Sequence, residues 1–301
     1  MTLFPIILVL VSTVAHAAWN LYVHSLPTTT GLFLRVSLLM GFGLIPLAFG
    51  GLGGTPFPLE VWLILAAAGV FQGIYAFGLT AGYRTGNFTV VYPMARALPV
   101  LLLALFDLSR GRPPSVLGWS GMLLVTLGCL MAPLVSLRQW SIRQYLTPTI
   151  FWVFVIAIGT VGYSALDKLA AEILSQRLDR IVSLVGFLTM MQYGLIEFFA
   201  SSPHLACVEW FQRRVRPAEE RTASWRSAVI VAVMIVFTYS LVLWAYQMMT
   251  HASYVVALRQ FSIVIGAVFG VILFREPAAR LRLAAALLIT LGVVCISFAG
   301  V

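Results

Sequence analysis

The chain has 301 residues, of which 61% are hydrophobic and only 10% are charged. An average soluble domain carries roughly 25% charged residues, so this composition excludes a soluble globule and predicts a surface that faces lipid. The net charge of +9 does not indicate nucleic-acid binding. Most basic residues stand in short segments between apolar runs, where they orient a protein in the bilayer. The three cysteines are too scattered to predict a disulfide framework or a metal site.

Apolar runs long enough to cross a bilayer follow one another along the chain, since a spanning helix needs about 20 apolar residues. The first run is expected to remain as a span. Although Ala15, His16 and Ala17 resemble a signal-peptidase site, no Lys or Arg precedes the run. The predicted spans cover residues 3–25, 28–49, 58–83, 87–108, 115–137, 148–170, 181–202, 227–250, 252–274 and 280–299.

Three connections between these runs carry information. Only a few residues separate the third run from the fourth, so these two spans are expected to form an antiparallel pair. Residues 138–147 are polar and are predicted to link two halves of the chain. The longest polar segment, residues 203–226, is predicted to be an extra loop, because it has no counterpart in the first half.

The chain also contains an internal repeat. Residues 75–128 align without a gap with residues 239–292, which places Pro113 on Pro277 and the Thr-Leu-Gly at 126–128 on that at 290–292. The early part of each half aligns at a shorter offset, with Trp19 on Tyr163. Duplication of this kind is a frequent way to build a transporter.

We therefore predict an all-α integral membrane fold with ten transmembrane helices, arranged as two inverted five-helix repeats. The first repeat is predicted at residues 1–137, the linker at 138–147 and the second repeat at 148–301. Because five is an odd number, the halves would insert in opposite orientations, related by an axis in the membrane plane.

The five-plus-five arrangement, the short turn after the third span and the Phe274-Arg275-Glu276-Pro277 junction resemble the EamA-type branch of the drug/metabolite transporter superfamily. In the first half, Arg112 takes the place of the junction glutamate. The resemblance implies a carrier of small metabolites such as amino acids, or of amphiphilic compounds. It also implies a central cavity between the halves and no ATP domain. No Gly-x-x-x-x-Gly-Lys phosphate loop occurs in the chain.

Charged side chains inside apolar runs are costly in lipid, and each is therefore a functional candidate. Arg96 lies in the fourth run and Arg259 in the ninth, the corresponding element of the other half. We expect both guanidinium groups to face the central cavity, where their planar forks suit a carboxylate or phosphate. The alternative is that each bonds helix carbonyls and stabilises packing.

Polar residues of the first and seventh runs form a second set of candidates. His16 and Asn20 share a helical face with Trp19 beside them. His16 and Glu197 are candidates for proton coupling, because imidazole titrates near neutral pH and Glu197 lies within a span. A buried histidine bonded to a carbonyl and an interfacial or arginine-paired glutamate are the alternatives.

Tyrosines are predicted to complete the substrate site, because a phenol combines an apolar ring with a hydroxyl and suits amphiphilic solutes. The alternative for such stripes is helix packing or an interfacial belt. The candidates are Tyr75, Tyr92, Tyr163, Tyr239 and Tyr246.

Other charged residues stand near the ends of runs. Glu60 and Asp107 are expected to be solvated there, and the adjacent Asp167 and Lys168 are expected to be interfacial.

These observations predict a secondary transporter that moves a small organic metabolite, with amino acids the best single class, by alternating access. Export across the inner (plasma) membrane of a bacterium is the expected direction, by a monomer or a homodimer. The chain is not expected to be an enzyme or to hold a cofactor or metal.

Three alternatives stay open. The first is efflux of amphiphilic or quaternary amines, whose cations aromatic rings can bind. A cavity with two arginines and no obvious central acid would bind such cations poorly. A membrane-embedded lipid enzyme would need a nucleophile–base or metal cluster, and the histidines are scattered. A scaffold without transport activity is the third.

Overall fold

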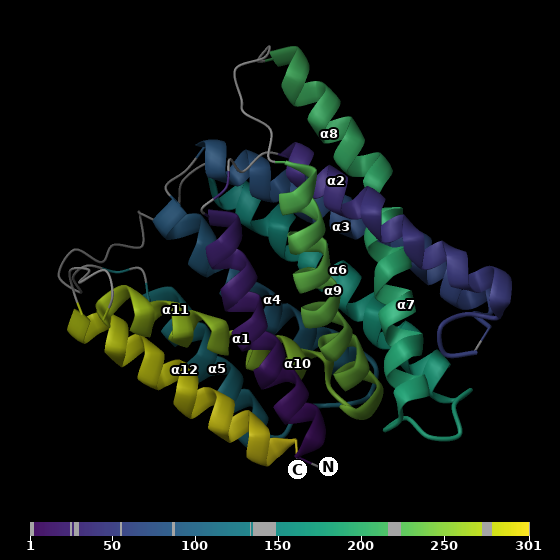
Figure 1. Cartoon of the computed structure of the whole chain (residues 1–301). Coiled ribbons are helices and arrows are strands. Elements are labelled where there is room, and N and C mark those ends of the chain that lie inside the picture. The colour runs from purple at the N-terminus through teal and green to yellow at the C-terminus, as the bar shows by residue number, and fades with distance from the viewer. Residues whose placement is uncertain are drawn as a thin grey trace.

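The computed structural model describes residues 3–24, 26, 30–54, 56–85, 88–132, 134, 149–215, 224–272 and 279–300. The regular elements in these ranges are helices, and no strand occurs among them (Figure 1). The helices are α1 (Phe4–His24), α2 (Thr30–Met40), the 3₁₀ helix η1 (Gly41–Phe49), α3 (Leu59–Thr85), α4 (Phe88–Ser109), α5 (Val116–Met131), α6 (Thr149–Ser175), α7 (Leu184–Ala200), α8 (Ser202–Val215), α9 (Trp225–Met248), α10 (Ala252–Arg259), α11 (Phe261–Ile272) and α12 (Ala279–Ala299).

The described part of each predicted apolar run lies mainly on one of these helices or on consecutive ones. Within the described ranges, six segments are long and apolar enough to cross a membrane. This confirms the predicted all-α membrane class. The six segments are Gly31–Phe49, Leu59–Gly78, Ile150–Ser175, Leu184–Phe211, Trp225–Met248 and Ala279–Ala299.

Two predicted spans are interrupted helices. The second run changes from α-helix to 3₁₀ helix at Gly41, and Pro46 lies inside the 3₁₀ part, where it cannot donate a backbone hydrogen bond. The ninth run breaks at Gln260, between α10 and α11. The side-chain Nε2 of Gln260 donates to Val256 O at 3.1 Å. The break leaves Arg259 in the last turn of a short helix.

The prediction that residues 203–226 form a loop is wrong for their first part, because α8 begins at Ser202. Pro203 does not prevent this helix, since proline is tolerated in a first turn. Leu205 is buried, whereas Trp210 and Phe211 are exposed. The helix packs against α2 and α3, and its far end projects from the rest of the molecule at the top of Figure 1. The predicted linker, residues 138–147, lies outside the described residues.

Helices distant in sequence pack closely in pairs. The main pairs are α3 with α6, α1 with α9, and α5 with α12. Small residues permit the close approach: a Cβ at Gly159 of α6 would lie 2.6 Å from the Tyr75 nitrogen of α3. These pairs place α1, α3, α6, α7, α9 and α10 around the interior, where the largest cluster of buried side chains lies.

The α5–α12 pair has the closest backbone contacts. A Cβ at Gly292 would lie 2.5 Å from Gly121 O, and a Cβ at Gly121 would lie 2.7 Å from Gly292 O. About two turns further along α5, a Cβ at Gly128 would lie 2.8 Å from Ala285 O. The two helices therefore touch through glycine backbones at two levels.

We expect Gly292→Ala to destabilise the protein by about 1–3 kcal/mol, because the added methyl group must push two helix backbones apart. Thermal unfolding of the purified protein in detergent measures this effect. Gly266→Ala is the matched control, because a Cβ at Gly266 in α11 meets no atom within 4 Å. Equal unfolding temperatures of both variants would contradict the assigned α5–α12 contact.

Candidate functional site

A buried carboxylate on α6 lies at the centre of the site. Asp167 is fully buried and accepts hydrogen bonds from two phenols, one on each of its oxygens. Tyr193 of α7 donates to Oδ1 at 3.0 Å, and Tyr239 of α9 donates to Oδ2. The expectation that Asp167 is interfacial is therefore wrong. The predicted run ended near residue 170, whereas α6 continues to Ser175 and carries Asp167 into the interior.

A second buried carboxyl group lies beside the first. Glu197 of α7 is fully buried, and its Oε1 accepts a hydrogen bond from Gln72 Nε2 of α3 at 2.9 Å. Its Oε2 has no hydrogen-bond partner in the described part of the chain. Asp167 and Glu197 are close enough to interact directly. Two carboxyl groups, from α6 and α7, thus share one desolvated region.

Arg259 supplies positive charge to the same region. Its guanidinium carbon lies 5.7 Å from the centre of the Tyr239 ring, in a cation–π arrangement. The guanidinium also interacts electrostatically with both Asp167 and Glu197. The described residues provide no hydrogen bond or ion pair to it, and the side chain is only partly buried. Its five donors are therefore available to a ligand.

Arg96 lies in a different contact, with α1. Its Nη2 is 3.0 Å from His16 Nε2, while Trp19 Nε1 is 3.1 Å from His16 Nδ1. A neutral imidazole has one acceptor nitrogen, so His16 cannot accept both hydrogen bonds at once. A charged ring could accept neither, and the arrangement therefore favours a neutral His16. Arg259 also acts electrostatically on His16, so both arginines approach the same ring.

The predicted tyrosines line this interior from several helices. Tyr75 and Tyr163 pack edge to face with ring centres 6.0 Å apart. Tyr239 packs in the same way against Phe198. Tyr246 is fully buried, and its hydroxyl has no partner among the described residues. The side chains of two further candidates, Tyr92 and Asn20, lie outside the described residues.

A small cavity of about 70 Å³ lies between α2, α3, α7 and α9. Gln72 and Tyr75 of α3 and Phe198 of α7 contribute to its wall, and Gln72 is the residue that holds Glu197. Gln72 therefore connects the wall of this cavity to the buried Glu197.

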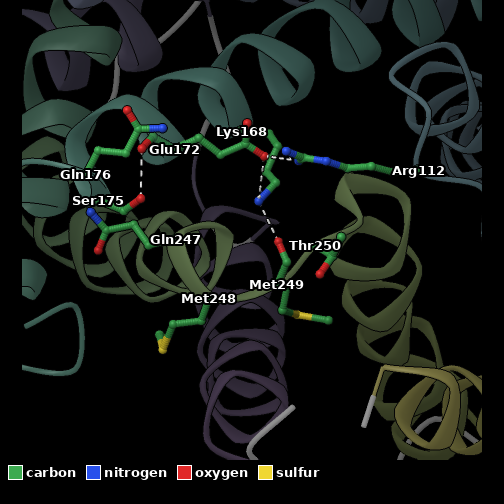
Figure 2. A pocket seen from close by; sticks show the side chains of 9 residues that line it. All are labelled: Arg112, Lys168, Glu172, Ser175, Gln176, Gln247, Met248, Met249 and Thr250. Carbon is green, nitrogen blue, oxygen red and sulfur yellow. Dashed lines mark hydrogen bonds and ion pairs between the residues drawn. The ribbon is translucent and has the colours of Figure 1, made fainter.

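A larger cavity, of about 300 Å³, lies where α6, α9 and the connection after α4 meet (Figure 2). Lys168 is buried there and donates to the carbonyl oxygens of Tyr246, at 2.8 Å, and Met249, at 2.5 Å. It therefore satisfies free carbonyl groups at the end of α9. Lys168, which is expected to be interfacial, is buried beside the end of α9 and the α4–α5 connection.

Glu172 joins three cations beside this cavity. It lies 2.9 Å from Arg110 and 3.1 Å from Lys168, and it also pairs with Arg112. Figure 2 shows Arg112 reaching toward Glu172 across the cavity from the α4–α5 connection. The ion pairs therefore join the first half of the chain to α6.

Asp107 is the other charged residue whose predicted environment is wrong. It is buried, not solvated, and accepts hydrogen bonds from the amide nitrogens of Ala252 (3.0 Å) and Ser253 (2.9 Å) and from Ser253 Oγ (2.6 Å). These bonds cap the first turn of α10, where a negative charge is favourable. Burial lowers the pKa of neighbouring His251, and Asp107 opposes that shift.

Within the described ranges, no group of three or more His, Cys, Asp or Glu residues is arranged to hold a metal ion. The buried polar groups are phenols, amides, carboxyls and guanidiniums. Such groups can bind and orient a charged organic solute or hold a proton.

Comparison with known proteins places the chain in a family. The model of the EamA-like transporter family matches residues 146–298. The chain belongs to this family. EamA-like transporters are part of the drug/metabolite transporter superfamily, so membership identifies the chain as a multi-pass membrane protein that transports small solutes. A search of curated proteins finds no match.

The fold recurs in a solved structure titled "Crystal structure of protein". The two chains are 14% identical, and the alignment covers 98% of each with a TM-score of 0.66. At that identity the likeness shows a shared fold for this EamA-like chain and says nothing of its solute.

We expect Tyr193→Phe to destabilise the protein by about 1–3 kcal/mol, because one oxygen of buried Asp167 would lose its donor. Tyr163→Phe is the matched control, since no hydrogen bond of the Tyr163 hydroxyl is found among the described residues. Unfolding temperatures in detergent should fall more for Tyr193→Phe. The reverse order would contradict the assigned Tyr193–Asp167 hydrogen bond.

Proposed function

We propose that this EamA-like chain is a secondary transporter for small organic solutes that carry a carboxylate, with amino acids the first class to test. The observation that carries the proposal is the Arg259 guanidinium, which has no hydrogen-bond or ion-pair partner among the described residues. It lies in an interior whose walls are aromatic. Because a guanidinium in an apolar interior is costly without a partner, an anionic solute group would complete the site.

Helix packing supports two inverted five-helix repeats, residues 1–137 and 148–301. The repeat alignment relates α1 to α6 and α3 to α9, and the pairs α3–α6 and α1–α9 are both close. The same alignment makes position 121 equivalent to position 285, and position 128 equivalent to position 292. The backbone contacts 121–292 and 128–285 therefore exchange with each other, as a two-fold axis requires. The family model covers residues 146–298, much of the proposed second repeat.

The solute carboxylate would accept two parallel hydrogen bonds from Arg259, because the guanidinium fork matches a carboxylate. Arg96 adds positive charge beside His16, which Arg259 also reaches electrostatically. Tyr75, Tyr163, Tyr239, Tyr246 and Trp19 would surround the rest of the solute, and Tyr92 and Asn20 remain candidates of the same kind.

Alternating access follows from the two related halves. The Glu172 ion pairs with Arg110 and Arg112 join the α4–α5 connection to α6. Separation of these pairs would open this end of the molecule, while the equivalent movement would close the other. We propose that the carrier works in the inner membrane of a bacterium, as a monomer or a homodimer, and exports solute that has accumulated in the cell, down the solute's own concentration gradient.

Efflux of amphiphilic or quaternary amines is the second candidate. The absence of an obvious central acid counted against it, but Asp167 and Glu197 now provide acidic groups in the interior. Against it, both oxygens of Asp167 already accept hydrogen bonds, and a cationic solute would meet Arg259. A lipid enzyme remains a weaker alternative, because the described residues contain no metal cluster.

We expect Arg259→Ala to lower uptake of a bound solute into proteoliposomes by roughly 30-fold or more. Loss of one partner from a buried charge pair costs about 2–5 kcal/mol. Arg96→Ala is expected to abolish uptake, because Arg96 adds positive charge beside His16. Solutes are first chosen by saturable binding to the purified wild type, from a panel of amino acids, organic anions and quaternary amines.

The matched control for both variants is Arg280→Ala, because Arg280 is exposed at the start of α12. All variants should elute as folded protein in detergent. Wild-type uptake by Arg259→Ala would remove the proposed role of this residue. Saturable binding restricted to quaternary amines would favour the second candidate function.

A further inference from the structure

Asp167 and Glu197 would carry two negative charges if both were ionised, whereas Arg259 supplies one positive charge to the same region. Both side chains are fully buried, and Glu197 lies one turn of α7 after Tyr193, whose hydroxyl donates to Asp167 at 3.0 Å. Two carboxylates in a region of low dielectric repel strongly, and such pairs share one proton instead of ionising together. One proton on the pair leaves a single negative charge, which the positive charge of Arg259 balances.

The hydrogen bonds indicate which carboxyl group holds the proton. Asp167 accepts from Tyr193 on one oxygen and from Tyr239 on the other, so its hydrogen bonds stabilise the ionised form. Glu197 accepts only from Gln72, on Oε1. Its Oε2 is buried without a partner in the described part of the chain, and a proton on this oxygen would remove an uncompensated charge.

Among the residues that the structure describes, Arg259 is the cation that acts on both carboxyl groups of the pair. The neighbouring helices contribute phenols, an amide and this cation, while Arg96 contacts His16. The groups that face the pair are Tyr163 of α6, Tyr193 of α7, Tyr239 and Tyr246 of α9, Gln72 and Tyr75 of α3, and Arg259 of α10.

We propose that the Asp167–Glu197 pair is a proton-binding site whose one exchangeable proton moves together with the solute carboxylate. Arg259 links the two events. When its guanidinium binds a solute carboxylate, it neutralises the carboxyl pair less well, and the pair then holds its proton more tightly. Linkage is reciprocal, so a protonated pair also strengthens binding of the carboxylate. Because this coupling works through Arg259, it rests on the proposed function.

The proton on the pair can be tested without any solute. Infrared spectra of the purified wild type at neutral pH should contain the carbonyl band of a protonated carboxyl group. Glu197→Gln should remove that band, whereas the control Glu60→Gln should keep it, because Glu60 is exposed at the start of α3. A wild-type spectrum without the band, or a band retained in Glu197→Gln, would overturn the proposal.

Coupling is tested with two probes, L-phenylalanine and 3-phenylpropionate, which share a ring and a carboxylate. An acidic exterior should drive accumulation of the transported probe inside proteoliposomes. A gradient of one pH unit supports a roughly tenfold concentration ratio when one proton accompanies each solute. Glu197→Gln should lose this pH-driven accumulation but retain exchange of labelled for unlabelled probe at equal pH.

These outcomes separate the two proposals. If the wild type neither binds nor exchanges any solute of the panel, the proposed transport function fails, and the infrared result still decides the proton site. If the wild type exchanges solute but a pH gradient drives no accumulation, or Glu197→Gln keeps pH-driven accumulation, the coupling proposal is wrong. Accumulation of the probe driven by an alkaline exterior would show that proton and solute move in opposite directions, and would overturn the proposal that they move together.

Discussion

The interior depends on the compensation of a fully buried carboxylate by the groups around it. Asp167 is fully buried and held by two phenols, and Arg259 lies over one of those rings and acts on the carboxylate. An isolated buried charge would cost several kcal/mol, so Asp167 requires these partners. Because Asp167, Tyr193, Tyr239 and Arg259 come from α6, α7, α9 and α10, this compensation also fixes how four helices lie together.

The sequence was most informative about features that follow from local composition. Long apolar runs predicted the helices, because a lipid-facing segment must satisfy its backbone within itself. The interruption at Gln260 was not predicted, since nothing in the apolar run 252–274 marks it. Helix α8 was missed because its polar residues were read as a loop, although an amphipathic helix at a surface also carries them.

The site was only partly predictable. Arg259 was found because it is a charge inside an apolar run. Asp167 was misplaced because its partners, Tyr193 and Tyr239, lie 26 and 72 residues away, and only the fold brings them together. Asp107 was misplaced for the same reason, since it binds the backbone of Ser253 at a separation of 146 residues. The position of a charged residue at the end of an apolar run does not by itself show whether its side chain is solvated or is buried against another helix.

The adjacent residues Asp167 and Lys168 restrict how the protein can move. Asp167 holds the side chain of Tyr239, and Lys168 holds the carbonyl groups of Tyr246 and Met249 at the end of α9. Buried contacts at two levels therefore join α6 to α9, and their separation would expose unpaired polar groups to a low dielectric. The Glu172 pairs with arginines are partly exposed and are worth much less. A transport movement that kept α6 and α9 together and broke the Glu172 pairs would leave the carboxyl pair intact.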